Sequence, residues 1–238
     1  MFKRWFGKPT QHCQEALRKT IVPKAHYSLA LEEYLNSPLP LLSDAINKLE
    51  FVALDFEMTG LDANHDKILS IGLVQLNCHE INLSSSHEIY LEHGNYVKRE
   101  SAEINEIVPN QLKDATDPKV ALDELLNHIR GKVVIAHSAC IERNFLNALI
   151  QHTHGLEKLP CHFIDTLYLE KKYSYAGQSK THMSYQLNDL RHHYNLPDYY
   201  AHSAASDALA CAELFLVQLA KLKLKSNTVL SDLTLASP

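Results

Sequence analysis

Two carboxylates stand one residue apart at the end of an apolar run, in the stretch FVALDFEMTGL that begins at Phe51. Side chains alternate faces along a β-strand, so Asp55 and Glu57 would project from one face, with Phe56 turned to the other. Neighbouring like charges repel and raise each other's pKa, which makes the pair unfavourable unless a cation lies between them. Hard divalent cations such as Mg²⁺ and Mn²⁺ prefer oxygen ligands of this kind, so the pattern indicates a metal site.

Two later segments add acids and a histidine at points where helices are expected to begin. In AHSACIERNFL, Glu142 lies in the opening turn of a helix that follows the short apolar run GKVVIAH. In YYAHSAASDALACAELF, His202 precedes a long helix and Asp207 falls five residues later. Taken singly, each has an ordinary explanation, because an acid in a first helical turn favours the helix dipole and loop histidines are common. Their significance depends on whether the fold brings them to the strand end that carries Asp55.

The elements that would position these residues are predicted from hydrophobic periodicity. The first three strands, joined by short links as in an antiparallel meander, are FVALDF, KILSIGLVQL and HEIYLE. A fourth strand is GKVVIAH, and a fifth opens HFIDTLYLEKKY, which continues as a helix. The other helices are INEIVPNQLKD, PKVALDELLNHIR, CIERNFLNALIQH, MSYQLNDLRHHYNL and AASDALACAELFLVQLAKLKL. This order predicts an α/β sandwich with a mixed five-stranded sheet.

The two ends of the chain lack the strand patterns that are predicted for its middle. Short amphipathic helices are expected in QEALRKTIV and YSLALEEYLN, and SPLPLL ends them. We therefore predict a helical N-terminal appendage over residues 1–50, with a surface-packing role favoured over a binding role. The main domain would span residues 51–222, and residues 223–238 would form a short polar tail that frays.

Composition limits the class of protein. The 238 residues are 45% hydrophobic and 21% charged, as in ordinary globular proteins. No apolar run approaches the roughly 18 residues of a membrane span, and the N-terminus lacks the apolar core of a signal peptide. Five widely spaced cysteines without a CxxC pair fit free thiols, which predicts a cytoplasmic location. The net charge of −5 argues against coating nucleic acid through bulk charge, yet allows an enzyme that holds one strand end.

In their order along the chain, the four acids and the histidine resemble the DEDDh branch of the DEDD exonuclease superfamily, which is DnaQ-like with a ribonuclease H-like fold. DFEMTGL corresponds to the motif D-x-E-T-T-G-L, ILSIGLVQL to the strand that follows it, and IDTL to a common family segment. The motif H-x-x-x-x-D is intact from His202 to Asp207. The resemblance covers residues 51–222. It departs from the family pattern at Met58, which replaces a Thr, and at Glu142, where the second motif usually ends in Asp.

The resemblance implies a three-layer sandwich and a 3′→5′ exonuclease that uses two Mg²⁺ or Mn²⁺ ions to hydrolyse phosphodiesters. Asp55 would bridge both ions, with Glu57 and Asp207 on the side of the nucleophile. Glu142 would support the other side. His202 would be the general base that takes a proton from the attacking water.

The resemblance also implies a pocket for the terminal nucleotide just past the first strand, where Gly60 lets the backbone approach closely. The residues that would line this pocket are Phe56, Thr59, Gly60 and Leu61. Four basic residues fall where a strand-binding surface could form, although a solvated basic face is the simpler interpretation. They are Lys171, Lys172, Lys180 and Arg191.

The substrate implied by the resemblance is a single-stranded 3′ end, from which nucleoside monophosphates would be released. DNA is favoured because the motifs look most like those of proofreading relatives, and RNA stays open because ribonuclease T and oligoribonuclease share them. A polymerase partner is possible but is not supported by a long C-terminal segment, because the sequence that follows the last predicted helix is short. A homodimer is also possible. The alternative of another class is a catalytically silent domain that binds nucleic acid or protein. Glu142 in place of Asp and the N-terminal appendage support that alternative, and the intact His202 and Asp207 argue against it.

Overall fold

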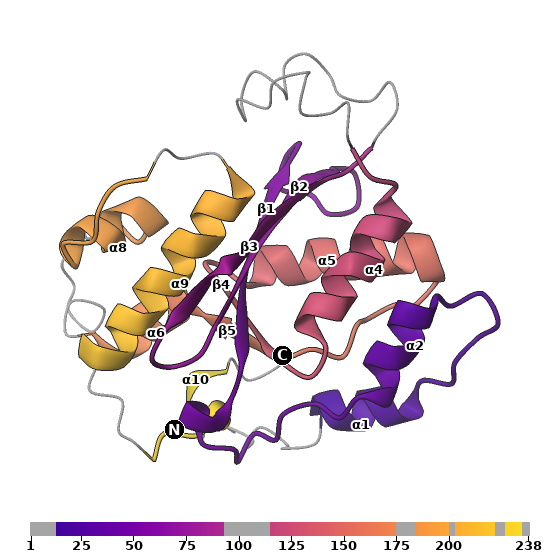
Figure 1. Ribbon diagram of the computed structural model, residues 1–238, viewed down its shortest axis with the longest axis horizontal. Coiled ribbons are helices and arrows are strands. Elements are labelled where there is room, and N and C mark those ends of the chain that lie inside the picture. The colour runs from indigo at the N-terminus through magenta and orange to yellow at the C-terminus, as the bar shows by residue number, and fades with distance from the viewer. Residues whose placement is uncertain (1–12, 93–114, 175–183, 200–202, 222–226, 235–238) are drawn as a thin grey trace, which may run out of the picture.

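The computed structural model describes residues 13–92, 115–174, 184–199, 203–221 and 227–234. Its centre is a mixed five-stranded sheet that lies between two groups of helices (Figure 1). The strands are β1 (Phe51–Met58), β2 (Ile68–Leu76), β3 (Ile81–Tyr90), β4 (Val133–Ala136) and β5 (Phe163–Asp165). The helices are α1 (Cys13–Thr20), α2 (Leu29–Asn36), the 3₁₀ turn η1 (Ile46–Lys48), α4 (Pro118–Ile129), α5 (Cys140–His154), α6 (Thr166–Tyr173), α8 (Leu187–His193), α9 (Ala204–Lys221) and α10 (Leu230–Leu233). The predicted α/β class and mixed sheet are confirmed.

The strand order is β3-β2-β1-β4-β5. Strands β1, β2 and β3 form the predicted antiparallel meander, and β1, β4 and β5 run parallel to one another. The carboxyl ends of β1, β4 and β5 therefore meet at one rim of the sheet. The segments that carry Asp55, Glu142 and Asp165 all start or end at this rim, so it is where the candidate site must form.

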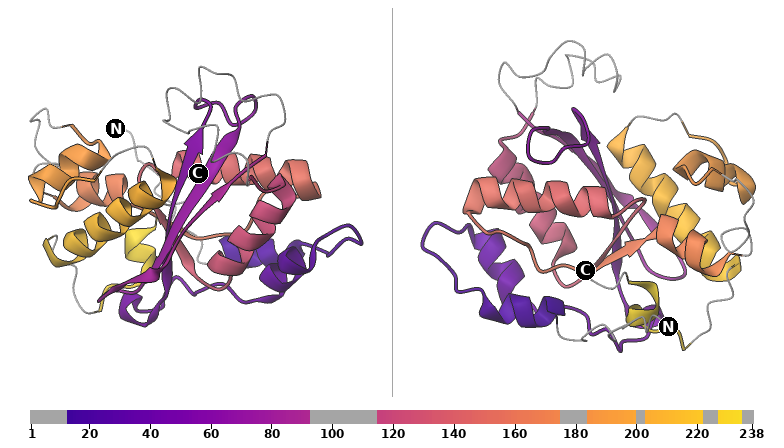
Figure 2. Two further views of the ribbon diagram at one scale, coloured as in Figure 1. Left: turned by 45° about the horizontal axis from the view of Figure 1, so that its top comes forward. Right: turned by 180° about the vertical axis from the view of Figure 1, so that it is seen from behind.

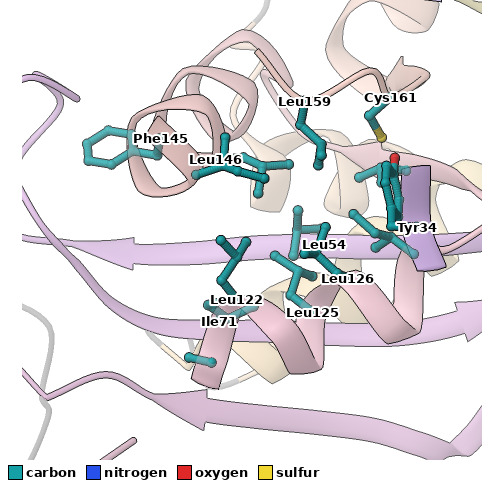
Figure 3. Packing of buried hydrophobic residues seen from close by; sticks show 14 of the residues in the cluster. Tyr34, Leu54, Ile71, Leu122, Leu125, Leu126, Phe145, Leu146, Leu159 and Cys161 are labelled. Carbon is teal, nitrogen blue, oxygen red and sulfur yellow. The ribbon is translucent and has the colours of Figure 1, made fainter. Parts of the chain in front are cut away.

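One face of the sheet is covered by α2, α4 and α5 (Figures 1 and 2). The close-up in Figure 3 shows side chains from both helical and sheet layers meeting there, among them Leu54 and Leu125, which are fully buried. The N-terminal segment belongs to this core, because Leu31 and Tyr34 of α2 are buried and the Tyr34 hydroxyl donates to the Pro160 carbonyl at 2.8 Å. The boundary placed after residue 50 stays a prediction, but α2 is packed into the main body of the fold.

The opposite face is covered by α6 and α9, and α10 adds to this second core. Leu230 and Leu233 are both fully buried, and the backbone N–H of Leu230 donates to the Asp44 carbonyl at 3.0 Å. The prediction that the C-terminal tail frays is therefore wrong for residues 227–234. Two leucines three residues apart lie on one side of a helical turn, and their burial holds this short segment in place.

Strand β3 begins at Ile81, six residues before the predicted strand HEIYLE. The added residues INLSSS belong to an edge strand and are mostly exposed. They therefore lack the alternation of apolar and polar residues by which a strand is predicted. The helix predicted over INEIVPNQLKD lies outside the described residues. Within the ranges that the structure describes, no helix is both long and apolar enough to cross a membrane.

Candidate active site

Asp55 and Glu57 project from β1 toward the side of the sheet that α9 covers. Asp55 is paired with Gly72 of β2 and Glu57 with Ser70, and the register of the two strands shifts just after Glu57. Phe56 points the other way and is only 3% exposed, in the core beneath α4 and α5. The predicted alternation along β1 is thus observed, and the buried Phe56 side chain is not available to line a pocket for the terminal nucleotide.

Gly72 brings α9 close to these acids. A Cβ atom at Gly72 would lie 1.9 Å from the carbonyl carbon of Ala204, a distance that no side chain tolerates. The first turn of α9 can therefore rest directly on β2, and it carries Asp207 to Asp55. One oxygen from each of Asp55, Glu57 and Asp207 lies within 4.8 Å of the others. The structure thus brings together three of the four predicted acids as one cluster.

Glu142, the fourth acid, reaches the site from the first turn of α5. Its side chain is buried, and its Oε2 atom has no hydrogen-bond partner among the described residues. Just before α5, Ser138 has a left-handed backbone with φ of 67°, a conformation that non-glycine residues seldom adopt. Its N–H donates to Asp165 Oδ1 at 3.0 Å, which ties the start of α5 to the end of β5. This turn fixes the start of α5, which carries Glu142 in its first turn.

The cluster is electrostatically unfavourable on its own. Burial raises the pKa of Asp55 well above its usual value, and the charges of Glu142, Asp207, Glu57 and Glu88 raise it further. Burial also raises the pKa of Glu142 to about 8, with a smaller contribution from the charge of Asp165.

A divalent cation would remove this penalty, because opposite charge favours the ionised form of each acid. Oxygens a few ångströms apart can share such an ion, whose ligand distances are roughly 2.0–2.6 Å. The described acids, including the buried oxygen of Glu142 without a partner, fit a divalent metal.

Glu88 is a residue of this site that the sequence analysis did not single out. It is paired with Gly72 from the β3 side, so Asp55, Gly72 and Glu88 lie in one row across the sheet. Its carboxylate accepts hydrogen bonds from Ser70 Oγ at 2.9 Å and Ser203 Oγ at 2.8 Å. These contacts fasten the start of α9 to β3. Period-two alternation in SSSHEIYLE places Glu88 on one face, but it does not say which helix lies over that face.

The loop after β1 is organised by Asp66, another residue that the sequence analysis did not single out. The Thr59 hydroxyl donates to Asp66 Oδ1 at 3.0 Å, and the backbone N–H of Asp62 donates to Asp66 Oδ2 at 2.9 Å. A Cβ at Gly60 would lie 2.5 Å from Asp66 Oδ2, so a side chain at this position would have to displace the Asp66 carboxylate. Leu61 stands at the tip of the loop with 75% of its surface exposed.

The remaining predicted residues have different positions. His202 and Lys180 lie outside the described residues. Arg191 is buried rather than surface-exposed, and its guanidinium forms an ion pair with Glu213 at 2.8 Å. It therefore fastens α8 to α9 and is not part of a strand-binding surface. Lys171 and Lys172 are both exposed.

Comparison with known proteins gives the family. The model of a family described as Exonuclease matches residues 52–215. The chain belongs to this exonuclease family. The matched segment begins with β1 and ends within α9, so it contains the positions of all four acids and of His202.

Relatives of this exonuclease domain include polymerases and stand-alone nucleases. A PolC-type DNA polymerase III of Thermotoga petrophila is 30% identical over 184 residues, which is 77% of this chain and only 13% of the polymerase. Ribonuclease T of Buchnera aphidicola is 27% identical over 198 residues, or 76% of this chain and 86% of the relative. The nuclease domain of 3′hExo, a DEDDh family member bound to rAMP, has the same fold, with a TM-score of 0.58 at 16% identity over 74% of this chain and 94% of that one. The DEDDh resemblance and the ribonuclease H-like fold are confirmed.

Proposed function

We propose that this protein is a metal-dependent 3′→5′ exonuclease that releases nucleoside monophosphates from single-stranded ends. The observation that carries the proposal is the convergence of Asp55, Glu57 and Asp207 within 4.8 Å, with the buried carboxylate of Glu142 beside them. Acids placed this close cost stability unless a cation binds, so a purely structural role would not account for them.

In this proposal Asp55, Glu57 and Asp207 hold divalent cations, and Glu142 completes the side that faces α5. Two Mg²⁺ or Mn²⁺ ions bound there would supply Lewis-acid chemistry, lowering the pKa of an attacking water and neutralising charge on the departing 3′ oxygen. His202 takes the proton of that water at an imidazole nitrogen, a role that suits a group whose pKa is near neutrality. Glu88 holds the start of α9, and hence Asp207, in register with β1.

The terminal nucleotide would bind against the loop after β1. This loop follows directly after the strand that carries Asp55 and Glu57, and the Leu61 side chain in it is exposed. The loop is fixed internally by Asp66, so it presents a preformed surface. Preformed geometry lowers the entropic cost of binding.

DNA is the favoured substrate, and RNA is the alternative within the same chemistry. The relatives support both, since one is a PolC-type DNA polymerase III and another is ribonuclease T. The distinction between the two sugars depends on contacts to a 2′-hydroxyl, which a few residues can make.

The test is an assay on 5′-labelled single-stranded DNA and RNA oligomers with Mg²⁺ or Mn²⁺, and with EDTA as a chemical control. Asp207→Asn should abolish the ladder of products shortened from the 3′ end. Asp189→Asn is the matched control, because Asp189 is an exposed acid in the first turn of α8, as Asp207 is in the first turn of α9. It should give a normal ladder.

Both outcomes are informative. A metal-dependent ladder that is lost in EDTA and in Asp207→Asn would support the proposal and rank DNA against RNA. Binding of either oligomer without release of nucleotides, with Mn²⁺ present and the protein folded, would instead favour the silent-domain alternative.

A further inference from the structure

Tyr185 lies close to the candidate site although it is far from the acids in sequence. Ala53 of β1 is paired with Ile135 of β4, and His137 is the first residue after β4, at the rim where β1, β4 and β5 end. The His137 ring then bridges to the backbone carbonyl of Tyr185 at 2.9 Å from Nε2. Through this bond Tyr185 is held at the rim of the sheet where β1, β4 and β5 end, which is also the rim that carries Asp55.

Two hydrogen bonds of the His137 ring hold the backbone at Tyr185 in place. Burial lowers the pKa of His137, which keeps the imidazole neutral near neutral pH. Because a carbonyl can only accept, Nε2 must carry the proton and donate to Tyr185. Nδ1 then accepts from the Thr166 hydroxyl at 2.8 Å. These two bonds connect β4, the start of α6 and the segment that leads into α8.

Lys171 completes a small surface with Tyr185. Its ammonium lies 5.1 Å from the centre of the Tyr185 ring, and its side chain is exposed. Among the residues that the structure describes, no carboxylate forms an ion pair with Lys171. The neighbouring Lys172 is engaged differently, because its ammonium donates to the Asp232 carbonyl at 2.9 Å. Lys171 is thus a cation available to a ligand beside an aromatic ring that is partly exposed.

We propose that Tyr185 and Lys171 bind the single strand on the 5′ side of the scissile phosphate, with a base stacked on the ring and a phosphate paired with the ammonium. An aromatic platform beside a cation is how proteins bind single strands without reading sequence. The protein as a whole carries a net charge of −5, so a local cation next to the acidic site gives the phosphate backbone a favourable path. This inference rests on the proposed exonuclease function and adds a substrate surface to it.

The experiment compares two substrates in the presence of Mn²⁺. One is a single-stranded DNA oligomer, and the other is the p-nitrophenyl ester of thymidine 5′-monophosphate, which has no base and no further phosphate on the 5′ side of the bond that is cleaved. The measured quantity is kcat/KM for the oligomer divided by kcat/KM for the ester. Tyr185→Ala should lower this ratio roughly 5- to 150-fold, the range expected from loss of one stacked base. Tyr185→Phe keeps the ring and should restore the wild-type ratio.

Salt dependence tests Lys171 separately. Each phosphate contact on a single strand contributes about 0.7 to the slope of log affinity against log salt concentration. Lys171→Ala should therefore reduce the slope for the oligomer by about 0.7 between roughly 50 and 200 mM KCl. Lys158→Ala is the matched control, because Lys158 is exposed in the loop between α5 and β5, away from this rim. Its slope should equal that of the wild type.

The possible results distinguish a failure of the proposed strand surface at Tyr185 and Lys171 from a failure of the proposed exonuclease function. If Tyr185→Ala keeps the wild-type ratio and Lys171→Ala keeps the slope, the strand surface is wrong while the exonuclease stands. A parallel loss on both substrates in Tyr185→Ala would place Tyr185 in the catalytic centre and would also overturn the inference. A wild-type protein that cleaves neither substrate would overturn the proposed function itself.

Discussion

Replacing Glu142 by glutamine should stabilise the metal-free protein, and the gain should grow with pH. The Glu142 carboxyl is buried and has a pKa of about 8 in the folded protein, against an ordinary value of 4.5. Between these two pH values the folded state holds a proton that the unfolded state has lost. The free energy of unfolding therefore falls as pH rises from the unfolded pKa to the folded pKa, and levels off above it. Glutamine is always neutral and has nearly the same shape, so the variant does not pay this cost.

The magnitude follows from the two pKa values. Each unit of pKa difference corresponds to about 1.4 kcal/mol, so the cost of Glu142 is about 1 kcal/mol near pH 5 and about 4 kcal/mol near pH 8. For a chain of this length, 1 kcal/mol shifts Tm by roughly 2–4 °C. We expect Glu142→Gln to raise Tm by about 2–4 °C near pH 5 and by about 8–16 °C near pH 8.

The assay is thermal unfolding in EDTA at both pH values, followed by a titration with Mn²⁺. Glu157→Gln is the control, because Glu157 is an exposed acid in the loop after α5 and should change stability by no more than about 0.5 kcal/mol. Mn²⁺ should stabilise the wild type more near pH 8 than near pH 5, and it should stabilise Glu142→Gln less than the wild type. A variant that is less stable than the wild type, or equally shifted at both pH values, would refute the reasoning.

Three further changes test other parts of the site. His202→Ala should reduce oligomer hydrolysis roughly 10²- to 10⁴-fold, measured by initial rates, while Mn²⁺ still raises Tm as in the wild type, since the base is not a ligand. Gly72→Ala should destabilise the protein by several kcal/mol in denaturant unfolding, and wild-type stability would contradict the close contact with Ala204. Arg191→Met should cost about 3–5 kcal/mol because it leaves Glu213 without its ion-pair partner and the Ala210 and Pro197 carbonyls without their donor, and the double variant Arg191→Met/Glu213→Leu should recover the part of the loss that is due to Glu213.

Much of the fold could be predicted because hydrophobic periodicity is strong in its central elements. Strands β1, β2 and β4 are almost wholly buried, so each is a short run of apolar residues in the sequence. Helix α9 has a long apolar side, so its apolar residues recur at helical spacing. The segment INLSSS and α10 were missed for the opposite reason. One is an exposed edge strand without an apolar pattern, and the other is a single turn whose two leucines become informative only when their neighbours in space are known.

In the candidate site too, features that depend on neighbouring residues in the sequence could be predicted, and contacts between distant segments could not. Asp55 and Glu57 were placed correctly on one face because alternation along a strand is a local rule. The contact of Gly72 with Ala204 joins positions that are far apart in sequence, and so does the hydrogen bond between Glu88 and Ser203. No spacing along the chain encodes such contacts. Burial of Arg191 was missed for a related reason, since an arginine on a short polar helix looks exposed until its partner Glu213 is placed beside it.

Glu142 first supported a silent domain, because a related enzyme would have Asp there, but its surroundings in the structure argue the other way. A site that no longer binds metal gains nothing from a carboxylate that is buried beside Asp55 and has a raised pKa. Glutamine at the same position would fill the space without the electrostatic cost. The hydrogen bond between Ser138 and Asp165 fixes the position at which α5 begins. Because Glu has one methylene more than Asp, the Glu142 carboxylate extends further from this helix than an Asp carboxylate would. A buried acid that costs stability in the absence of a cation is the arrangement expected of a ligand, and this favours a functional metal site over a silent one.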